Sequence, residues 1–538
     1  MNRKQIVLSI FLFTIVGVIL GCVLPKPPIF KTPTNNKNTG EGTSPEIVTP
    51  KNARLYTGSS ITADLNLQTD STYFVDPQLY NFSLGFMFGN TMDEMPEVRK
   101  LIKDLKPNVM RFPGGTVANF YHLEGAGYGM KDNEVQTVPI YQLNQKSRQN
   151  MSNNMIDRFI PIVKENNAKV LLVANMYTSN PDEVVAMAKK FRANGIEIVG
   201  IELGNELYFK VYEAKYTDGA AYLTKCKEFV PVIKAYDKSI PLGVLACPLG
   251  GSANREKFRT WNELLGKEDF YDAYIVHEYT QCKACNQNET ADMDFIFNQC
   301  GMTVTSISYN NVRQFVYDYY KQFFPNKKQW ITEWNTINTE PYMSNTFLQG
   351  AHNADYLLNI IDVNAANNNP INIASFHALA GDGITFPMIF YKENQKGTLN
   401  GNSSVSTTAS YYTFYFFRNI FIDNARKCKQ SITLSSGANE KDVIIRSFIS
   451  TEKKKLYIYC INKSSANTTL NINGSTSKSG TYEYIKGTQL WSLGSSNNQA
   501  MTKKATGNDI MQLYNKNITG LYGITIPSFS YGVIEFTL

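Results

Sequence analysis

Histidine and tryptophan are scarce in this sequence, which contains four of each among its 538 residues. The four histidines show no His-x-x-x-His or similar spacing of metal ligands, so we expect no metal and no other cofactor. Charged residues account for only 18% of the chain, and the formal net charge is +7. Because the lysines are scattered instead of clustered, this charge gives no indication of nucleic-acid binding.

Cysteine is also infrequent, and its spacing gives little support for a metal site. Cys282-x-x-Cys285 with Cys300 could suggest zinc, but no histidine stands nearby at ligand spacing and a fourth ligand is missing. In an exported chain, a local disulfide from Cys282 or Cys285 to Cys300 is favoured over a metal, and the pairing stays open. Seven of the eight cysteines lie beyond residue 22, so at least one thiol is unpaired.

Residues 1–22 have the pattern of an export signal: a basic start, a long apolar run and a Gly-Cys end. The sequence of residues 19–22, Ile-Leu-Gly-Cys, resembles a bacterial lipobox, in which the cysteine, here Cys22, is lipidated. A simple membrane anchor and an ordinary signal peptide are the alternatives. Residues 23–50, rich in Pro, Thr, Asn and Lys, are expected to form a disordered tether. The sequence therefore predicts an exported lipoprotein at a membrane surface, either the cell surface or facing the periplasm.

Between residues 81 and 421, short apolar strands alternate with segments of helical spacing. This alternation predicts a (β/α)8 TIM barrel. A doubly wound open sheet is the main competitor, but no Gly-rich phosphate loop follows the first strand. One helix is expected to begin at Asn180-Pro181 and to end before Gly195. The eight predicted strands are residues 82–89, 109–115, 169–177, 198–206, 241–248, 271–279, 329–335 and 372–381.

The pattern changes near residue 422, where short alternating runs are separated by Ser, Asn and Gly turns. Such runs are typical of a β-sandwich, which we expect over residues 422–538. Residues 51–80 also have strand character and are expected to join that sandwich before the chain enters the barrel. The predicted fold class is thus α/β, with a TIM barrel followed by a C-terminal β-sandwich.

Polar and aromatic residues stand at the carboxyl ends of six predicted strands, the face of a barrel that carries its active site. Two of them, Glu206 and Glu333, end strands four and seven, which face each other across the barrel mouth. Cleavage of a glycosidic bond needs two such carboxyl groups, one protonated to donate to the leaving oxygen and one ionised. The strand-end residues are Arg111, Asn175, Tyr177, Asn205, Glu206, His277, Tyr279, Glu333, Trp334 and His377.

The motifs around these residues resemble those of clan A of the glycoside hydrolases. "LGNE" (203–206) is similar to the strand-four acid/base signature of that clan, and "ITEWN" (331–335) is similar to its strand-seven nucleophile signature. "RFPGG" (111–115) and "VHEYT" (276–280) resemble segments of the family 51 arabinofuranosidases and their relatives in families 39 and 79. The closing "IPSFSYGVIEFTL" resembles the final sandwich strand of those families.

The resemblance implies a retaining glycosidase and a role for each residue. Glu206 would be the general acid/base, Glu333 the nucleophile, and Asn205 the partner of the sugar's 2-hydroxyl. Arg111 and Tyr279 would hold Glu333 ionised, since a cation and a hydroxyl donor both lower the pKa of a carboxylate. The remaining side chains implied to line the glycone subsite are His277, Asn175, Tyr177, Trp334 and His377.

Two acidic residues beside these motifs have more ordinary interpretations. Glu202 lies mid-strand at an even offset from Glu206 and is expected to support the site. Glu278 alternates with His277 and Tyr279 and is expected to face away from it.

The chain also departs from the family 51 pattern. Residues 116–130 lack the usual tryptophan and arginine after Pro-Gly-Gly, and strand eight offers Phe376 and His377 in place of a stacking tryptophan. The sugar, its linkage and exo or endo action therefore stay open, as does the oligomeric state. We expect a carbohydrate substrate, a polysaccharide or oligosaccharide; the alternative is a non-catalytic glycan-binding lipoprotein on a barrel scaffold.

Overall fold

The computed structural model describes residues 60–83, 95–124, 129, 131, 134, 154–248, 255–280, 317–336, 344–381, 386–392, 404–435, 437–438, 440–490, 492–494 and 510–538. The predicted export signal with Cys22, the tether, and Cys282, Cys285 and Cys300 lie outside these residues and stay predictions. Among the helices of the described ranges, none combines the length and hydropathy that a membrane span requires.

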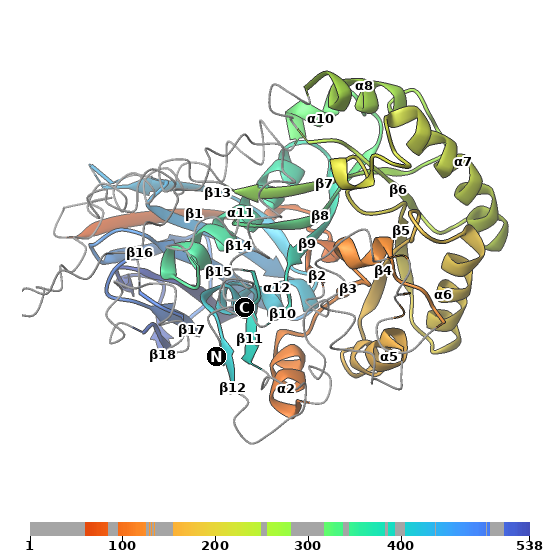
Figure 1. Cartoon of the computed structure of the whole chain (residues 1–538). Coiled ribbons are helices and arrows are strands. Elements are labelled where there is room, and N and C mark those ends of the chain that lie inside the picture. The colour runs from red at the N-terminus through yellow and green to blue at the C-terminus, as the bar shows by residue number, and fades with distance from the viewer. Residues whose placement is uncertain are drawn as a thin grey trace, which may run out of the picture.

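Eight parallel strands close into a barrel, which confirms the predicted fold class (Figure 1). Each of them falls within or overlaps one of the predicted strands. β2 pairs with both β3 and β9, so that Phe82 lies between Met110 and Phe376 and the sheet has no free edge. The strands are β2 (Asn81–Ser83), β3 (Val109–Phe112), β4 (Lys169–Val173), β5 (Ile198–Glu202), β6 (Leu242–Leu245), β7 (Ala273–Thr280), β8 (Lys328–Thr336) and β9 (Ile371–His377).

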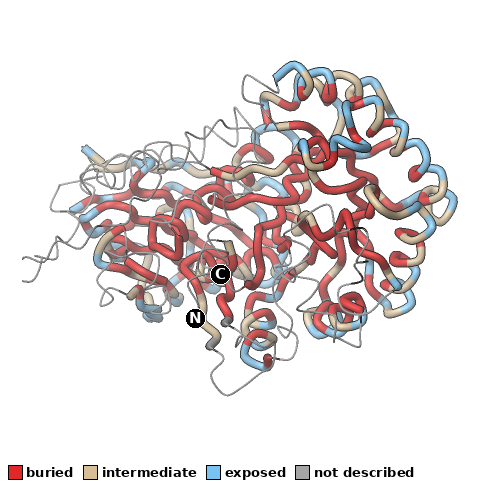
Figure 2. Tube along the Cα trace, in the orientation of Figure 1, coloured by how far each residue is buried: buried red, intermediate tan, exposed pale blue. Residues whose placement is uncertain are grey.

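Helices cover the outside of the barrel, and Figure 2 shows that α5 to α8 turn their exposed residues outward while the strands are buried. The helix predicted at Asn180 begins there: the Asn180 side chain accepts a hydrogen bond from the N–H of Glu183, and Gly195 follows the end at a φ of 75°. The helices are α2 (Pro96–Leu105), α5 (Met155–Glu165), α6 (Pro181–Ala193), α7 (Gly219–Tyr236), α8 (Arg255–Leu265), α10 (Tyr319–Lys321), α11 (Phe347–Ala366) and α12 (Ala409–Ile422).

Short elements fill several of the connections, with η1 before the first barrel strand and the others after barrel strands. Three are single 3-10 turns, and three short strands form a small separate sheet. They are η1 (Pro77–Leu79), η3 (Thr116–Asn119), η4 (Lys210–Tyr212), β10 (Ala380–Gly381), β11 (Ile389–Lys392) and β12 (Ser404–Thr407).

A mostly antiparallel sheet of nine strands forms the second part of the molecule, on the left in Figure 1. Only residues 520–523 connect its two edge strands, β18 and β19, so the sheet folds back on itself as a β-sandwich and encloses its own apolar core. β1, which precedes the barrel in sequence, lies between β13 and β16 in this sheet. The strands are β1 (Ile61–Tyr73), β13 (Arg426–Leu434), β14 (Val443–Ser450), β15 (Lys455–Asn462), β16 (Thr468–Asn473), β17 (Ser479–Lys486), β18 (Gln512–Thr519), β19 (Ile524–Ile526) and β20 (Ser530–Thr537).

The barrel and the sandwich pack tightly through α11 and α12. Arg446 of β14 donates to Asp362 of α11 at 2.9 Å, and the hydroxyl of Tyr531 on β20 donates to the carbonyl of Ala409 on α12 at 2.6 Å. The apolar core of the barrel continues across this junction into the sheet. The sandwich therefore supports the helices behind β8 and β9, and through them the barrel mouth.

Candidate active site

A buried arginine joins three strand ends at the barrel mouth. Arg111 of β3 donates from Nε and Nη2 to the two carboxylate oxygens of Glu202 on β5, at 2.6 and 2.9 Å. Its Nη1 donates to Oε1 of Glu333 on β8 at 2.7 Å. Burial alone would lower the pKa of Arg111, but the two carboxylates raise it above its ordinary value. Arg111 is therefore a permanent cation held between two carboxylates.

Glu333 is held as a carboxylate by this arrangement. The hydroxyl of Tyr279, on β7, donates to its Oε2 at 2.7 Å, while Arg111 occupies Oε1. Burial by itself raises the pKa of Glu333, but the charges of His277 and Arg111 and the Tyr279 hydrogen bond outweigh it and hold the pKa far below its usual range. His377 adds to this effect only when protonated, and burial lowers its own pKa.

Glu206 follows β5 and reaches the same point from the opposite side of the mouth. Its Oε1 lies 2.9 Å from Nδ1 of His277, and that nitrogen is 3.7 Å from Oε2 of Glu333. One ligand atom from each of these three residues lies within 4.8 Å of the other two. The Glu206 side chain is 19% exposed and that of Glu333 is 7% exposed, so Glu206 is the more accessible of the two carboxyl groups.

His277 bridges the two carboxyl groups. Its Nε2 lies 3.1 Å from the hydroxyl of Thr332, which fixes the ring. Burial lowers the pKa of His277, but Glu333 and Glu206 raise it above its ordinary value. The imidazole therefore keeps a proton beside Glu206 to a higher pH than a free histidine would.

Asn205 presents an unused hydrogen-bond donor. Its Oδ1 accepts from Nη2 of Arg111 at 2.9 Å, which orients the amide. Its Nδ2 is buried and has no hydrogen-bond partner among the described residues. A buried donor without a partner costs about 1–3 kcal/mol, and an acceptor that approached Nδ2 would remove this cost.

His377 and Tyr279 border Glu333 on the β9 side. Their rings meet edge to face at 6.2 Å, and Phe386 lies 5.2 Å from the His377 ring. Burial lowers the pKa of His377, which leaves the imidazole neutral near pH 7. His377 therefore lies close to Tyr279 and Glu333, and its place in the glycone subsite stays a prediction.

Trp334 does not line the mouth, so that prediction was wrong. Successive side chains of a strand point to opposite faces, and β8 turns Glu333 inward and Trp334 outward. The indole is buried against α11 and α12, stacked on Tyr356 at 4.9 Å and 5.8 Å from Phe414. Trp334 is a core residue of the helix layer.

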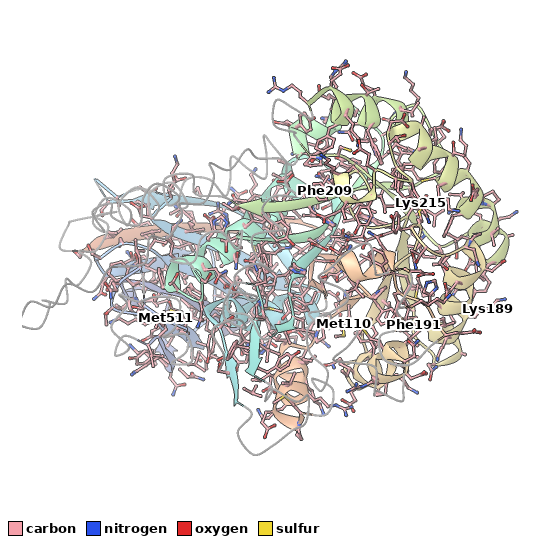
Figure 3. The ribbon with its side chains drawn as sticks, viewed as in Figure 1. Met110, Lys189, Phe191, Phe209, Lys215 and Met511 are labelled. Atoms are coloured by element: carbon pink, nitrogen blue, oxygen red, sulfur yellow. The ribbon has the colours of Figure 1, made fainter. Side chains whose placement is uncertain are left out.

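Asn175 and Tyr177 organise the loop after β4. Nδ2 of Asn175 donates to the carbonyl of Tyr121 and to the hydroxyl of Thr178, and its Oδ1 accepts from the N–H groups of Tyr177 and Thr178. These four contacts use the hydrogen-bonding capacity of Asn175, and its place in the glycone subsite stays a prediction. Tyr177 is half-buried, with the ammonium of Lys215 4.8 Å from its ring centre; Figure 3 marks Lys215.

Two hydroxyl residues of the site, Ser83 and Thr332, were not singled out from the sequence. Glu202 supports the site, as expected, but its bidentate pairing with Arg111 was not foreseen. The hydroxyls of Ser83 and Thr332 complete this pair, with Ser83 Oγ 3.4 Å from Arg111 and Thr332 donating to Glu202 at 3.0 Å. Polar residues inside apolar strands are the signal that could have identified both. Met110 in Figure 3 marks β3 next to Arg111, and Phe209 marks the segment after Glu206.

A second histidine cluster lies in the loop after β3. His122 has its Nδ1 2.9 Å from Glu183 on α6 and its Nε2 2.6 Å from Glu134. Burial lowers the pKa of His122, but these two carboxylates raise it above the usual value of 6.5, while His122 and its neighbours lower that of Glu183. The protonated ring ties this loop to the start of α6.

We expect His122→Gln to destabilise the protein more at pH 6 than at pH 9. A group whose pKa is raised on folding contributes its full stability below the unfolded pKa of about 6.5 and loses it as pH rises through the folded pKa. Loss of a charged hydrogen bond predicts a cost of about 1.5–3 kcal/mol at pH 6. Urea unfolding of both proteins at the two pH values measures this, and equal differences would contradict it.

The described residues contain one group able to bind a metal ion, namely Glu206, His277 and Glu333. Both oxygens of Glu333 already accept hydrogen bonds, and the Arg111 guanidinium beside them opposes a further cation. The two carboxyl groups and the imidazole suit proton transfer better than the binding of a metal ion.

The sequence and the structure of this chain were compared with those of known proteins. No protein-family model and no curated protein sequence matches the chain. Its structure is similar to the α-L-arabinofuranosidase of Thermotoga maritima solved with arabinose, with a TM-score of 0.61 and 16% identity over 89% of this chain and 100% of that one. The chain shares the fold of that protein, a (β/α)8 barrel with a β-sandwich.

Two further structures share the fold. The family 51 arabinofuranosidase of Xanthomonas axonopodis pv. citri has a TM-score of 0.60 and 13% identity, over 89% of this chain and 100% of that one. A family 44 xyloglucanase of Paenibacillus polymyxa has a TM-score of 0.56 and 12% identity, over the same shares. Because the matches cover 89% of this chain, they include both the barrel and the sandwich.

Proposed function

We propose that this protein is a retaining glycoside hydrolase in which Glu333 is the nucleophile and Glu206 the general acid/base. One observation carries the proposal: the two carboxyl groups approach within 4.8 Å from opposite sides of the mouth. Retaining enzymes place their carboxyl groups about 5–5.5 Å apart, whereas inverting enzymes need roughly 6.5–9.5 Å for a water molecule. The short separation supports double displacement.

The environment of Glu333 suits the nucleophile role. Glu333, kept ionised by Arg111 and Tyr279, attacks the anomeric carbon while Glu206 gives its proton to the leaving oxygen. The products of this step are the free leaving-group alcohol and a glycosyl ester on Glu333. Water then attacks the same carbon while Glu206 takes its proton. The bond between that carbon and Glu333 breaks, which frees the Glu333 carboxylate, leaves Glu206 protonated again and releases the sugar with its original configuration.

Asn205 fits the hydroxyl next to the reacting carbon. Arg111 fixes its Oδ1, so the unpaired Nδ2 is presented as a rigid donor. A hydroxyl oxygen of the sugar would satisfy it, and a contact that strengthens as positive charge develops on the ring lowers the barrier. The partner that the resemblance to clan A implies is the 2-hydroxyl.

A substrate screen tests the proposal directly. Aryl α-L-arabinofuranosides, arabinan and xyloglucan come first, because similar structures belong to arabinofuranosidases and a xyloglucanase. Release of reducing sugar is expected, followed by proton NMR that shows the initial product with the substrate's anomeric configuration. An inverted product would contradict the retaining mechanism. Binding without release would favour the alternative, a non-catalytic glycan-binding protein.

We also propose that the enzyme is exported and held at a membrane by a lipid on Cys22, a proposal supported only by the lipobox-like sequence. Cells fed an alkyne fatty acid are expected to label the full-length protein and the Cys226→Ser control, whose cysteine is buried in α7. Cys22→Ser is expected to lose essentially all label and to leave the membrane fraction. Equal labelling of Cys22→Ser would refute the anchor.

A further inference from the structure

The chain leaves β5 in an unusual backbone conformation just where it carries the proposed acid/base. β5 ends at Glu202, and Gly204 and Glu206 then adopt φ values of 91° and 48°. The left-handed region is unfavourable for a glutamate, and such conformations persist only where surrounding contacts impose them. The position of the Glu206 carboxyl group therefore depends on what holds the peptide before it.

One side chain binds both backbone polar groups of Asn205, the residue before Glu206. Nδ2 of Asn119 donates to the carbonyl oxygen of Asn205 at 2.7 Å, and Oδ1 of Asn119 accepts from the N–H of Asn205 at 3.1 Å. Asn119 is buried at the end of η3, and its own carbonyl accepts from the hydroxyl of Thr178 at 3.3 Å. The side-chain amide of Asn119 thus makes the two backbone hydrogen bonds that a neighbouring strand would otherwise make.

We propose that Asn119 is a positioning residue that sets the general acid/base. This inference rests on the proposed function, and it assigns Asn119 no contact with substrate. By satisfying both polar groups of the Asn205 backbone, Asn119 imposes the turn that carries Glu206 to His277. Without it the acid would sit away from the leaving oxygen, whereas the nucleophile on β8 would stay in place.

The barrel supplies a matched control. On α8, Asn262 grips the backbone of Cys247 in the same way, accepting from its N–H at 2.7 Å and donating to its carbonyl at 3.0 Å. Asn262 is also fully buried, and it acts after β6, which carries no proposed catalytic residue. Asn262→Ala therefore reproduces the structural cost of losing such a pair without touching Glu206.

Leaving-group dependence separates the two roles. Aryl glycosides of the sugar released in the screen are compared, with phenol or 2,4-dinitrophenol as leaving group. Phenol needs a proton from the acid, whereas dinitrophenolate departs without one. We expect Asn119→Ala to lower kcat/KM about 100-fold for the phenyl glycoside and less than about 5-fold for the dinitrophenyl glycoside. Asn262→Ala should change both by the same factor.

A second variant decides the matter if Asn119→Ala does not fold. Asn119→Asp keeps an oxygen for the Asn205 N–H but cannot donate to its carbonyl when ionised, and a smaller loss with the same leaving-group dependence is expected. A uniform loss across leaving groups in the folded variant would overturn the inference. Glu206→Ala distinguishes this from failure of the proposed function: if it shows no leaving-group dependence, Glu206 is not the acid and both proposals fall.

Discussion

Glu333→Gln is expected to lower kcat by about 10⁴-fold or more, because the amide cannot form the glycosyl ester on which double displacement depends. The fold should survive, since the amide is nearly isosteric and Arg111 keeps its bidentate partner Glu202. Initial rates on the best substrate of the screen, with circular dichroism and urea unfolding alongside, measure both effects.

The control for this variant is Glu165→Gln, which removes an exposed carboxylate paired with Arg99 on the barrel surface. It is expected to keep full activity. Near-normal hydrolysis by Glu333→Gln would remove Glu333 from the nucleophile role, and with it the main support for a retaining mechanism.

Arg111→Met is expected to destabilise the protein by about 3–5 kcal/mol, because it leaves the fully buried carboxylate of Glu202 without its cation. Glu333 loses its Arg111 hydrogen bond in the same variant, so its pKa should rise and activity should fall at the acid end of the pH profile. Urea unfolding gives the first quantity, and kcat/KM against pH gives the second.

Two companion variants show whether burial is the cause. Arg99→Met breaks an ion pair whose side chains are 34% and 48% exposed, and a cost below about 1 kcal/mol is expected. The double variant Arg111→Met with Glu202→Gln removes the uncompensated charge and should recover much of the stability without recovering activity. An equal loss for Arg111→Met and Arg99→Met would contradict a buried network at the mouth.

Much of this architecture could be predicted because it repeats along the chain. Eight apolar runs alternate with helical segments, and strands of that kind must be covered on both faces. The start of α6 at Asn180 could be predicted because an N-cap is a local contact, formed with the N–H of Glu183 three residues later.

The site itself could be predicted in part. Arg111, His277, Tyr279 and Glu333 lie in the carboxyl-terminal halves of parallel strands and Glu206 lies just beyond one, and these strand ends meet at one face. Trp334 was misplaced although its strand carried the answer: if Glu333 faces the mouth, its neighbour must face the helices. A tryptophan next to a catalytic glutamate suggests a sugar-stacking residue, but the alternation of side chains along β8 excludes it.

Asn119 marks the limit of sequence reasoning on this chain. It lies in a loop without periodicity, and its two hydrogen bonds join it to a peptide 86 residues away. No local pattern could indicate such a contact, because its existence depends on how β3 and β5 are placed by the whole barrel. The same holds for the hydrogen bond from Asn175 to the carbonyl of Tyr121, 54 residues away.

The amino-acid sequence by itself determined the order of strands, the two-part architecture and the pair of glutamates at opposed strand ends, since each follows from periodicity or from short motifs. Only the tertiary structure decided that Arg111 pairs with Glu202 as well as Glu333, that Nδ2 of Asn205 has no partner among the described residues, and that Asn119 binds the backbone before Glu206. The physical reason is that hydrogen bonding between buried groups depends on distances of a few tenths of an ångström, which long-range packing sets.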